Sequence, residues 1–329
     1  MIYIETKSTD AAFHFSVEEY IMRYYPWNQP VMMIWQADKC AMLGSNQIAE
    51  AEIDMDIAAQ NSIQVVRRSS GGGTIFTDMG TLLYTLIVPY THESSPWEVA
   101  AAIVANALNK LGVPAKIQGR NDILVDGGKV SGLAQYIRHG RICSHGSLLY
   151  DADLGTLSSL LTPDEEKIRS KALRSVRSRV TNIKEHMPAD NLSIRQFWDA
   201  LKLELFRSKP ATEYIFTEDE LAKINQIHRE KYANDAWTFG RAPQFTFHSS
   251  KRFEAGKIEI FLDVKGGTIA ECSIKGDFLC ALPIQGLEEL FVGKPFNRQM
   301  FTAVLGGVSL QPYIGNIAQE EFLICVFGE

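Results

Sequence analysis

The chain has 329 residues, enough to bury a full core and more typical of two domains than of one. Apolar residues make up 46% and charged residues 22%, which is ordinary for a globular enzyme, and a net charge of -6 argues against nucleic acid as the main partner. The five cysteines include no C-x-x-C pair, which indicates a reducing compartment with neither a disulfide framework nor a zinc site.

The beginning of the chain shows no signal-peptide pattern. The strongest apolar run, residues 82–88, is too short to span a bilayer and is followed by Pro89. We therefore expect a cytoplasmic protein that does not enter a membrane.

Three segments are rich in residues that suit buried strands, namely 62–66, 82–88 and 141–149. A helix is expected between the second and the third. Ser95 is its N-cap, Glu98 completes a capping box, and Gly112 is the stop signal. Its predicted apolar face consists of Val99, Ile103, Ala107, Leu108 and Leu111.

Two further helices have the same kind of start signal. Ser193 with Gln196 begins one, and Thr217 with Glu220 begins the other. The first is expected to bury Ile194, Phe197, Trp198, Leu201 and Leu205, and the second Leu221, Ile224 and Ile227. Trp237 and Phe239 are expected in the core.

The character of the chain changes after Pro243. The polar stretch 248–252 is typical of a linker, and residues 258–264 alternate between apolar and polar before a glycine turn and a second strand, 269–274. We therefore predict a first domain over 1–247 and a small second domain, with a β-hairpin, over 248–329.

Two glycine-rich segments carry the strongest functional signal. In 67–76, two arginines lead into three glycines, a pattern that brings backbone N–H groups and a cation against an anionic ligand. In 127–132, Lys129 stands between glycines, close in sequence to Asp122. Together they predict a nucleotide-using site. The familiar motifs are absent: Val130 follows the lysine of a would-be Walker A loop, Phe76 stands where a Rossmann fingerprint needs glycine, and no G-x-S-x-G occurs.

Several segments, in order and rough spacing, resemble those of the lipoate-protein ligases: 13–19, 67–73, 121–122, 128–132, 145–149, 175–182 and 237–240. The resemblance covers nearly the whole chain. It implies an α/β (α+β) fold, with a catalytic domain of mixed sheets shared with biotin ligases and a small α+β C-terminal accessory domain.

The resemblance also implies a reaction. These ligases join lipoate to ATP with Mg²⁺, release pyrophosphate, and pass the lipoyl group from lipoyl-AMP to one lysine of an acceptor protein. The expected acceptor is a glycine-cleavage H or H-like protein, or the lipoyl domain of a 2-oxoacid dehydrogenase acyltransferase. The enzyme is expected to act as a monomer.

Lys129 matches the family's catalytic lysine. A carboxylate brought to about 4 Å from the α-phosphate is repelled by roughly 4 kcal/mol at an effective dielectric constant near 20, so a bridging cation is needed. The positions that match adenylate contacts are Arg68, Gly73, Thr74, Ile75, Phe76, Asn121, Asp122 and Lys129. Those that match lipoate contacts are Ser70, Gly71, Gly72, Lys129, His145 and Gly146, and Asp122 is the candidate Mg²⁺ ligand.

The chain departs from the family pattern at three positions. Thr77 replaces a histidine, which suggests a changed pocket wall or acceptor contact; Thr81 replaces an asparagine that could brace the loop; and Ile48 replaces an asparagine. This divergence suggests a specialised ligase for an H or H-like protein. A basic run is expected to cover the phosphates or to dock the acceptor: Lys167, Arg169, Lys171, Arg174, Arg177 and Arg179.

Three alternatives remain open at this point. An ATP-independent octanoyl or lipoyl transferase of the same fold needs a reactive thiolate, for which Cys143, two residues before His145, is the candidate. A non-catalytic protein that holds lipoate or lipoyl-AMP is the second. A biotin ligase is the third, but its arginine-glycine loop is absent.

Overall fold

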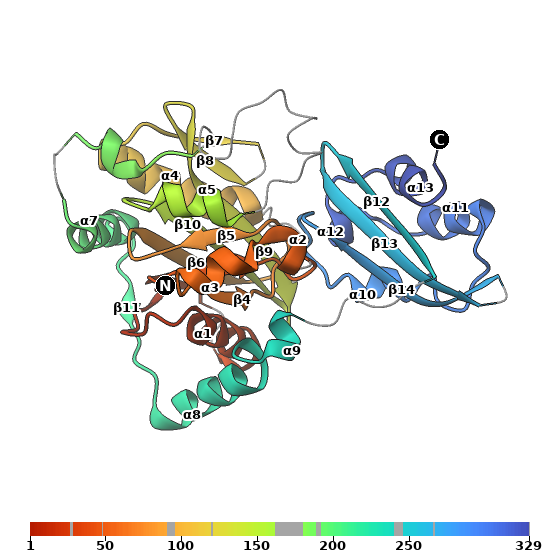
Figure 1. Cartoon of the computed structure of the whole chain (residues 1–329). Coiled ribbons are helices and arrows are strands. Elements are labelled where there is room, and N and C mark those ends of the chain that lie inside the picture. The colour runs from red at the N-terminus through yellow and green to blue at the C-terminus, as the bar shows by residue number, and fades with distance from the viewer. Residues whose placement is uncertain are drawn as a thin grey trace.

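The computed structural model describes residues 1–26, 29–47, 49–90, 96–119, 121–161, 180–188, 192–239, 246–265 and 267–328. The chain forms a large α/β body, which ends with α9, and a smaller body formed by β12 to α13 (Figure 1). No helix among the described residues is both long and apolar enough to cross a membrane.

The large body is built on a mixed sheet of eight strands in the order β11-β1-β2-β6-β10-β9-β8-β7. The strands β11, β1 and β2 run parallel, and the remaining pairs are antiparallel. Their bounds are Ile2–Ile4 (β1), Val31–Trp35 (β2), Thr81–Pro89 (β6), Ala115–Gln118 (β7), Asp122–Val125 (β8), Gly128–Arg138 (β9), Arg141–Leu149 (β10) and Thr212–Glu213 (β11). The mixed sheet confirms the expected fold class.

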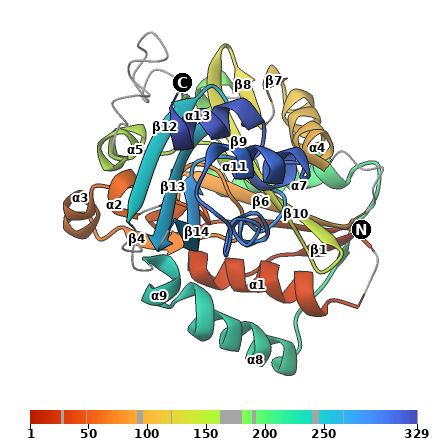
Figure 2. The ribbon, with the colours of Figure 1, turned by 90° about the vertical axis from the view of Figure 1, so that its right-hand side faces the viewer.

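Alternation along the strands gives this sheet two apolar faces. In β2, Met33 and Trp35 face the core on one side, while Met32 and Ile34 face the core on the other. The first side is covered by α1 (Ala11–Tyr24), α8 (Glu218–Ile227) and the π-helical turn η3 (His228–Tyr232), with α1 and α8 side by side in Figures 1 and 2. The second side is covered by α4 (Pro96–Lys110) and α7 (Ile194–Phe206).

A small second sheet, in the order β4-β3-β5, carries the glycine-rich segment. β4 (Gln64–Arg67) and β5 (Ile75–Thr77) both pair with β3 (Cys40–Leu43), so residues 68–74 form the connection between two strands of one sheet. We call residues 68–74 the glycine loop. Short elements complete the body: α2 (Ala49–Glu52), α3 (Met55–Gln60), α5 (Leu154–Leu160), η2 (Ile183–His186) and α9 (Asp235–Thr238).

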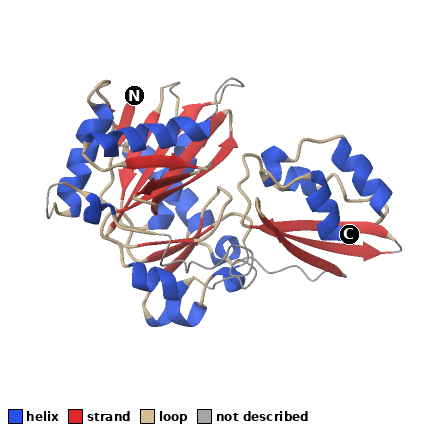
Figure 3. Ribbon diagram, turned by 90° about the horizontal axis from the view of Figure 1, so that it is seen from above, coloured by secondary structure: helices blue, strands red, loops and turns tan. Residues whose placement is uncertain are grey.

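The smaller body is a three-stranded antiparallel sheet with helices on one face (Figure 3). Its elements are β12 (Phe247–Phe253), β13 (Gly256–Lys265), β14 (Thr268–Gly276), α10 (Gln285–Glu288), α11 (Arg298–Gly306), α12 (Gln311–Ile314) and α13 (Gln319–Phe327). The predicted hairpin is confirmed as β13 and β14. The linker prediction is wrong, because 248–252 lies inside β12. All five residues are polar although they alternate between the two faces of the strand, and Ser249 on the inner face donates to Cys325 O of α13, so no apolar alternation marks this part of the strand in the sequence. We propose that the second domain begins with β12.

The two bodies meet at the glycine loop. Gly72 N–H donates to Phe278 O at 3.0 Å, and two more backbone hydrogen bonds, from Ile137 N to Ala281 O and from Gly276 N to Asn46 O, flank it at 2.7 and 2.9 Å. A Cβ on Gly71 would lie 2.7 Å from Cys280 Sγ, so only glycine allows this approach. The loop is therefore held from both domains.

The local helix signals are largely confirmed. Both capping boxes, at Ser193 and at Thr217, are present, and a positive φ of 84° at Gly112 follows the end of α4. Ser95 and the side chain of Glu98 lie outside the described residues. Two predicted buried residues are exposed: Val99 at 51% and Leu221 at 36%. The buried face of α4 consists of Ala100, Ala101, Val104, Ala105, Ala107 and Leu108. It shares only Ala107 and Leu108 with the predicted apolar face, which is therefore rotated partly away from the core.

The predicted strands vary in accuracy. Residues 141–149 coincide with β10, and 82–88 lie within β6. The strand expected at 62 begins two residues later, because Ser62 has a φ of 52° and belongs to the turn after α3.

Candidate active site

Arg67 is a structural clamp next to the glycine loop. Its guanidinium donates to the carbonyl oxygens of Gly44 at 2.8 Å and Gln47 at 2.6 Å on one side, and of Trp237 and Thr238 at 2.6 to 3.1 Å on the other. Trp237 Nε1 returns a hydrogen bond to Arg67 O at 2.9 Å. The buried arginine thus joins the second half of the large body to β3 and β4. Trp237 and Phe239 are half-buried against the core, close to their predicted place.

Arg68 holds the loop from inside. Its Nη1 donates to Met42 O at 2.8 Å, its Nη2 to Gly71 O and Gly73 O at 2.9 and 2.8 Å, and its Nε to Ser70 Oγ at 3.0 Å. Burial lowers the pKa of Arg68 to about 10. The guanidinium also lines the cavity described below, so it shapes the loop whether or not it touches a nucleotide.

Lys129 lies near the start of β9, and its side chain is 35% exposed. Its Nζ is 2.7 Å from Asp122 Oδ1 on β8. A Cβ on Gly132 would lie 2.9 Å from this Nζ, so the missing side chain gives the ammonium its place. The backbone of Lys129 is fixed by Thr181, whose N–H donates to Lys129 O at 3.0 Å. The Gly-Lys-Val-Ser-Gly pattern therefore positions a lysine beside a carboxylate, as the sequence predicts.

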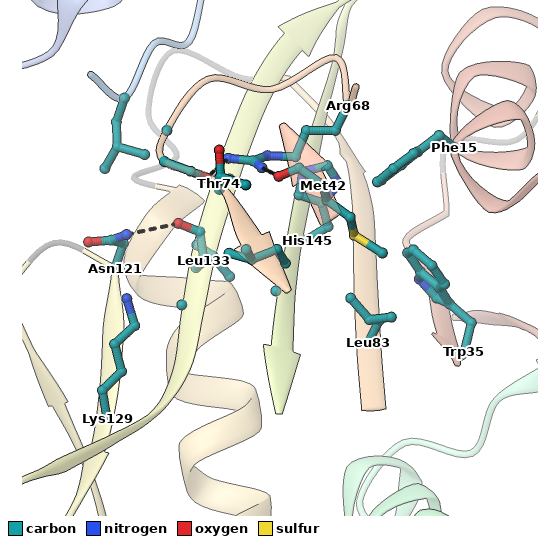
Figure 4. A pocket seen from close by; sticks show the side chains of 17 residues that line it. Phe15, Trp35, Met42, Arg68, Thr74, Leu83, Asn121, Lys129, Leu133 and His145 are labelled. Atoms are coloured by element: carbon teal, nitrogen blue, oxygen red, sulfur yellow. Dashed lines mark hydrogen bonds between the residues drawn. The ribbon is translucent and has the colours of Figure 1, made fainter. Parts of the chain in front are cut away.

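A cavity of about 150 Å³ connects Lys129 with the glycine loop (Figure 4). Nine of the predicted site residues line it: Arg68, Gly72, Gly73, Thr74, Ile75, Asn121, Lys129, His145 and Gly146. Four others, Ser70, Gly71, Phe76 and Asp122, are not among its lining residues in the part of the chain that the structure describes. Asp122 contacts Lys129, and Ser70, within the glycine loop, is completely buried and bonded to Arg68 and His145. The ligand contacts assigned to these residues stay predictions.

The sequence does not predict the apolar wall of the cavity. It is formed by Phe15, Trp35, Met42, Leu83, Leu133, Ala134 and Leu279. Lys129 and Asn121 lie at one side of the cavity, whereas Phe15, Trp35 and Leu83 lie at the opposite side (Figure 4). These residues come from five elements and from the second domain, and most are as apolar as ordinary core residues, so nothing local marked them. The side chain of Phe15 lies in the segment 13–19 that carried part of the family resemblance.

His145 is held at both ring nitrogens. Its Nε2 is 2.6 Å from Ser70 Oγ, and its Nδ1 is 3.0 Å from each carboxylate oxygen of Glu18 on α1. Thr85 Oγ1 donates to Glu18 Oε1 at 2.6 Å. Glu18 was not predicted as a site residue, because a glutamate in an amphipathic helix usually faces solvent. The ring is therefore fixed rather than free to exchange partners.

Cys143 is completely buried and is not among the residues that line the cavity. Burial raises the pKa of its thiol well above the ordinary value, and Glu18 adds to this. The sulfur lies within 4.8 Å of the nearest ligand atoms of Glu18 and His145, but these two already hydrogen-bond each other. The thiol is therefore a poor nucleophile.

The described departures from the family pattern lie away from the surface. Thr77 is completely buried in β5 and is not a lining residue, so the expectation of a changed pocket wall or acceptor contact is wrong. Thr81 Oγ1 donates to Asp78 Oδ1 at 3.3 Å and so supplies a brace of its own. Ile48 and the basic run 167–179 lie outside the described residues.

Comparison with known proteins agrees with this geometry. The family model for the lipoyl protein ligase A/B catalytic domain matches residues 10–206, and the model for the bacterial lipoate protein ligase C-terminus matches residues 242–326. The chain is 36% identical to lipoate-protein ligase LplJ of Bacillus subtilis, over 99% of this chain and 100% of the relative. It is 33% identical to a lipoate–protein ligase of Streptococcus pyogenes, over 97% and 96%.

Two solved structures share the fold. P. falciparum LipL1, solved in complex with lipoate, has a TM-score of 0.79 at 19% identity and covers 98% of this chain and 96% of its own. A bi-partite lipoate protein ligase of Thermoplasma acidophilum has a TM-score of 0.64 at 26% identity, over 75% and 98%. The chain belongs to the lipoate-protein ligase family. It is an enzyme of that type, with the catalytic and C-terminal domains in one chain.

Proposed function

We propose that this enzyme activates lipoate with ATP and transfers the lipoyl group to a lysine of an acceptor protein. The lipoate carboxylate attacks the α-phosphate, the bond to pyrophosphate breaks, and lipoyl-AMP forms. The acceptor amine then attacks the lipoyl carbonyl carbon, and AMP leaves. Both steps develop negative charge on oxygen atoms near the acyl–phosphate junction, which is where a fixed cation is most effective.

The main support for this proposal is a single cavity that has the ammonium of Lys129 and Asn121 at one side and the apolar side chains of Phe15, Trp35 and Leu83 at the opposite side. The glycine loop also lines this cavity. A short alkyl chain gains roughly 0.8 kcal/mol for each CH₂ that it buries, so the apolar wall suits the acyl part of lipoate. The ammonium of Lys129 and the backbone of Gly73, Thr74 and Ile75, which line the same cavity, are available to the adenylate. A crystal structure of a lipoate-protein ligase A was solved bound with ATP, which supports the assignment of an adenylate site.

Asp122 is suited to help bind Mg²⁺. Mg²⁺ is usually held by one or two carboxylates together with substrate phosphates and water, and Asp122 presents a carboxylate that is 33% exposed beside Lys129. The ion, when bound with ATP, would shield phosphate charge. Asp122 itself orients the ammonium of Lys129 through the 2.7 Å ion pair.

The acceptor remains a proposal on sequence grounds: an H or H-like protein, or a lipoyl domain. The bi-partite archaeal ligase was studied with its E2 lipoyl domain, which supports the class of acceptor. Equal lipoylation rates on an H protein and on a lipoyl domain would argue against an enzyme that is specialised for the H or H-like protein.

We also propose that the enzyme is a monomer and that it is cytoplasmic, and the five free cysteines are in keeping with a reducing compartment.

The experiment that tests the ligase proposal is lipoate-dependent exchange between ATP and pyrophosphate. We expect exchange in the wild type and in Cys143→Ser. A thioester-forming transferase would show none, and the buried, protonated thiol argues against that mechanism. A non-catalytic binding protein would hold lipoate without exchange. Either result overturns the proposal.

A further inference from the structure

Two adjacent glutamates on α1 are each connected by hydrogen bonds, through other side chains, to one of two adjacent serines of the glycine-rich segment. Glu18 contacts His145, which contacts Ser70. Glu19 contacts Lys231 and Tyr232, and both of these contact Ser69, at 3.0 and 2.7 Å. The two paths are separate, and all of these side chains except Lys231 are less than 9% exposed. Only the Glu18 path continues to Arg68.

The hydrogen atoms of the Glu18 path can be placed consistently. Arg68 Nε–H can only donate, so Ser70 Oγ accepts from it and donates its own hydrogen to His145 Nε2. Nδ1–H of His145 then donates to Glu18, which also accepts from Thr85. The tautomer is assigned from these partners. Every step runs in one direction, from the guanidinium to the carboxylate.

Arg68 has no carboxylate in direct contact among the hydrogen bonds and ion pairs that the structure describes. Its direct partners are three carbonyl oxygens and the hydroxyl of Ser70. Its neighbour Arg67 is equally buried and carries the same charge. A buried guanidinium needs compensation, and Glu18 is the acidic group that the Ser70–His145 bridge connects to it.

We propose that Glu18 is a positioning residue that acts through His145 and Ser70 on Arg68. This series of hydrogen bonds fixes the glycine loop in the shape that binds ATP. Arg68 holds Gly71 O and Gly73 O, so its orientation determines where the loop's backbone N–H groups point. The inference rests on the proposed function in one respect, namely that ATP binds at this loop. The mechanical part, control of loop shape by Glu18, is independent of it.

The variants follow from the bond pattern. Ser70→Ala removes the link between His145 and Arg68, and Ser70 itself is not among the residues that line the cavity. Glu18→Gln keeps the shape and an accepting oxygen but removes the charge. Ser69→Ala is the matched control, because it removes a buried hydroxyl one residue away that belongs to the Glu19 path.

Two readouts are measured on the full chain. Hydrogen–deuterium exchange of the peptide spanning 69–76 reports loop stability without any ligand. ATP–pyrophosphate exchange gives the KM values for ATP and for lipoate. We expect Ser70→Ala and Glu18→Gln each to speed loop exchange and to raise the KM for ATP about tenfold, as for the loss of a hydrogen bond to a charged group, with a smaller change for lipoate.

The double variant Ser70→Ala/Glu18→Gln tests whether Glu18 acts through Ser70. If Glu18 acts through Ser70, the double variant behaves like the more affected single variant, whereas Ser69→Ala combined with Glu18→Gln gives additive effects. Additive effects of Ser70→Ala and Glu18→Gln, or unchanged loop exchange in Ser70→Ala, overturn the inference. A wild type without lipoate-dependent exchange overturns the proposed function instead, and the deuterium readout then still tests the control of the loop by Glu18.

Discussion

The two sides of the cavity are built in opposite ways. At the polar side, Lys129 and Asp122 form one ion pair, and both side chains are about one-third exposed. At the apolar side, Trp35 is 1% exposed, and its Nε1 donates to Thr85, which donates to Glu18. One side has a partly exposed ion pair, and the other has a buried wall that is fixed by packing and by hydrogen bonds.

This difference matches what each part of the reaction demands. The acyl chain keeps one shape throughout, so a rigid wall can bind it without further ordering. The phosphate and carbonyl groups develop negative charge during the two steps, so they need a cation that is held at a defined place. The ion pair with Asp122 places the ammonium of Lys129, and the partial exposure of both side chains leaves that ammonium accessible to a ligand.

The largest effect is expected from Lys129→Ala. Among the described residues that line the cavity, Lys129 and Arg68 carry a positive charge, and the guanidinium of Arg68 is already engaged by the glycine loop. We expect lipoate-dependent ATP–pyrophosphate exchange to fall by about 10²–10³-fold, as for the loss of one preorganised group that stabilises charge. Lipoate binding, measured by calorimetry, should weaken far less. Lys116→Ala, at an exposed position on β7 of the same sheet, is the control and should keep its activity. Comparable rates in the two variants would contradict the role of Lys129.

The same contrast explains what could be predicted from the sequence. The polar side was predictable because its groups are close in sequence: Asp122, Lys129 and Gly132 fall within eleven residues. The capping boxes at Ser193 and Thr217 were predictable for the same reason. The apolar side was not, because Phe15, Trp35 and Leu83 come from α1, β2 and β6, which only the tertiary fold brings to one cavity.

The errors have the same origin. Leu221 and Val99 fit a helical period of apolar residues, but the period does not say which direction faces the sheet. Residues 248–252 look like a linker because residues of both faces of β12 are polar in this segment, so the apolar alternation of a strand is missing. Glu18 could not be recognised as part of the site, since its partners Thr85 and His145 lie on strands that are 67 and 127 residues further along the chain.

A second prediction sharpens the polar side. In Gly132→Ala, the new methyl group would lie 2.9 Å from Lys129 Nζ and 3.1 Å from Cε, so the ammonium must move while the backbone need not. We expect the exchange rate to fall about tenfold, because small displacements of a catalytic group are costly. The melting temperature should hardly change. Gly306→Ala, where a Cβ meets no atom within 4 Å, is the control. Wild-type exchange in Gly132→Ala would mean that the position of the ammonium is not critical.

A third prediction tests the rigid side. Leu83→Phe adds bulk beside Trp35, at the side of the cavity away from Lys129 (Figure 4). We expect the KM for lipoate to rise about fivefold, equivalent to about 1 kcal/mol of overpacking, with the KM for ATP nearly unchanged. Octanoate, which lacks the ring, should be affected less. A wall that yields would instead leave both acids unaffected, and an equal rise in both KM values would mean that the two sides are not independent.

A last prediction concerns the pH dependence of stability at the rigid side, which does not involve the reaction itself. His14 stacks on Trp35 with the ring centroids 4.3 Å apart, and its Nε2 lies 2.9 Å from Ser8 O. Burial lowers the pKa of His14 from 6.5 to about 4. Above pH 6.5 the imidazole is neutral in both the folded and the unfolded chain. As the pH falls from 6.5 to 4, the unfolded chain takes up the proton first, so the free energy of unfolding falls, and below pH 4 the loss is complete.

At pH 5 this difference amounts to about 2 kcal/mol of the free energy of unfolding. His14→Gln has no such proton, so urea unfolding at pH 7 and pH 5 should show a smaller acid destabilisation in the variant than in the wild type. Any packing lost through the substitution is the same at both pH values and cancels in the comparison. An equal acid destabilisation in the two proteins would show that the histidine is protonated without leaving its place against Trp35, and the wall would then be less rigid than its packing indicates.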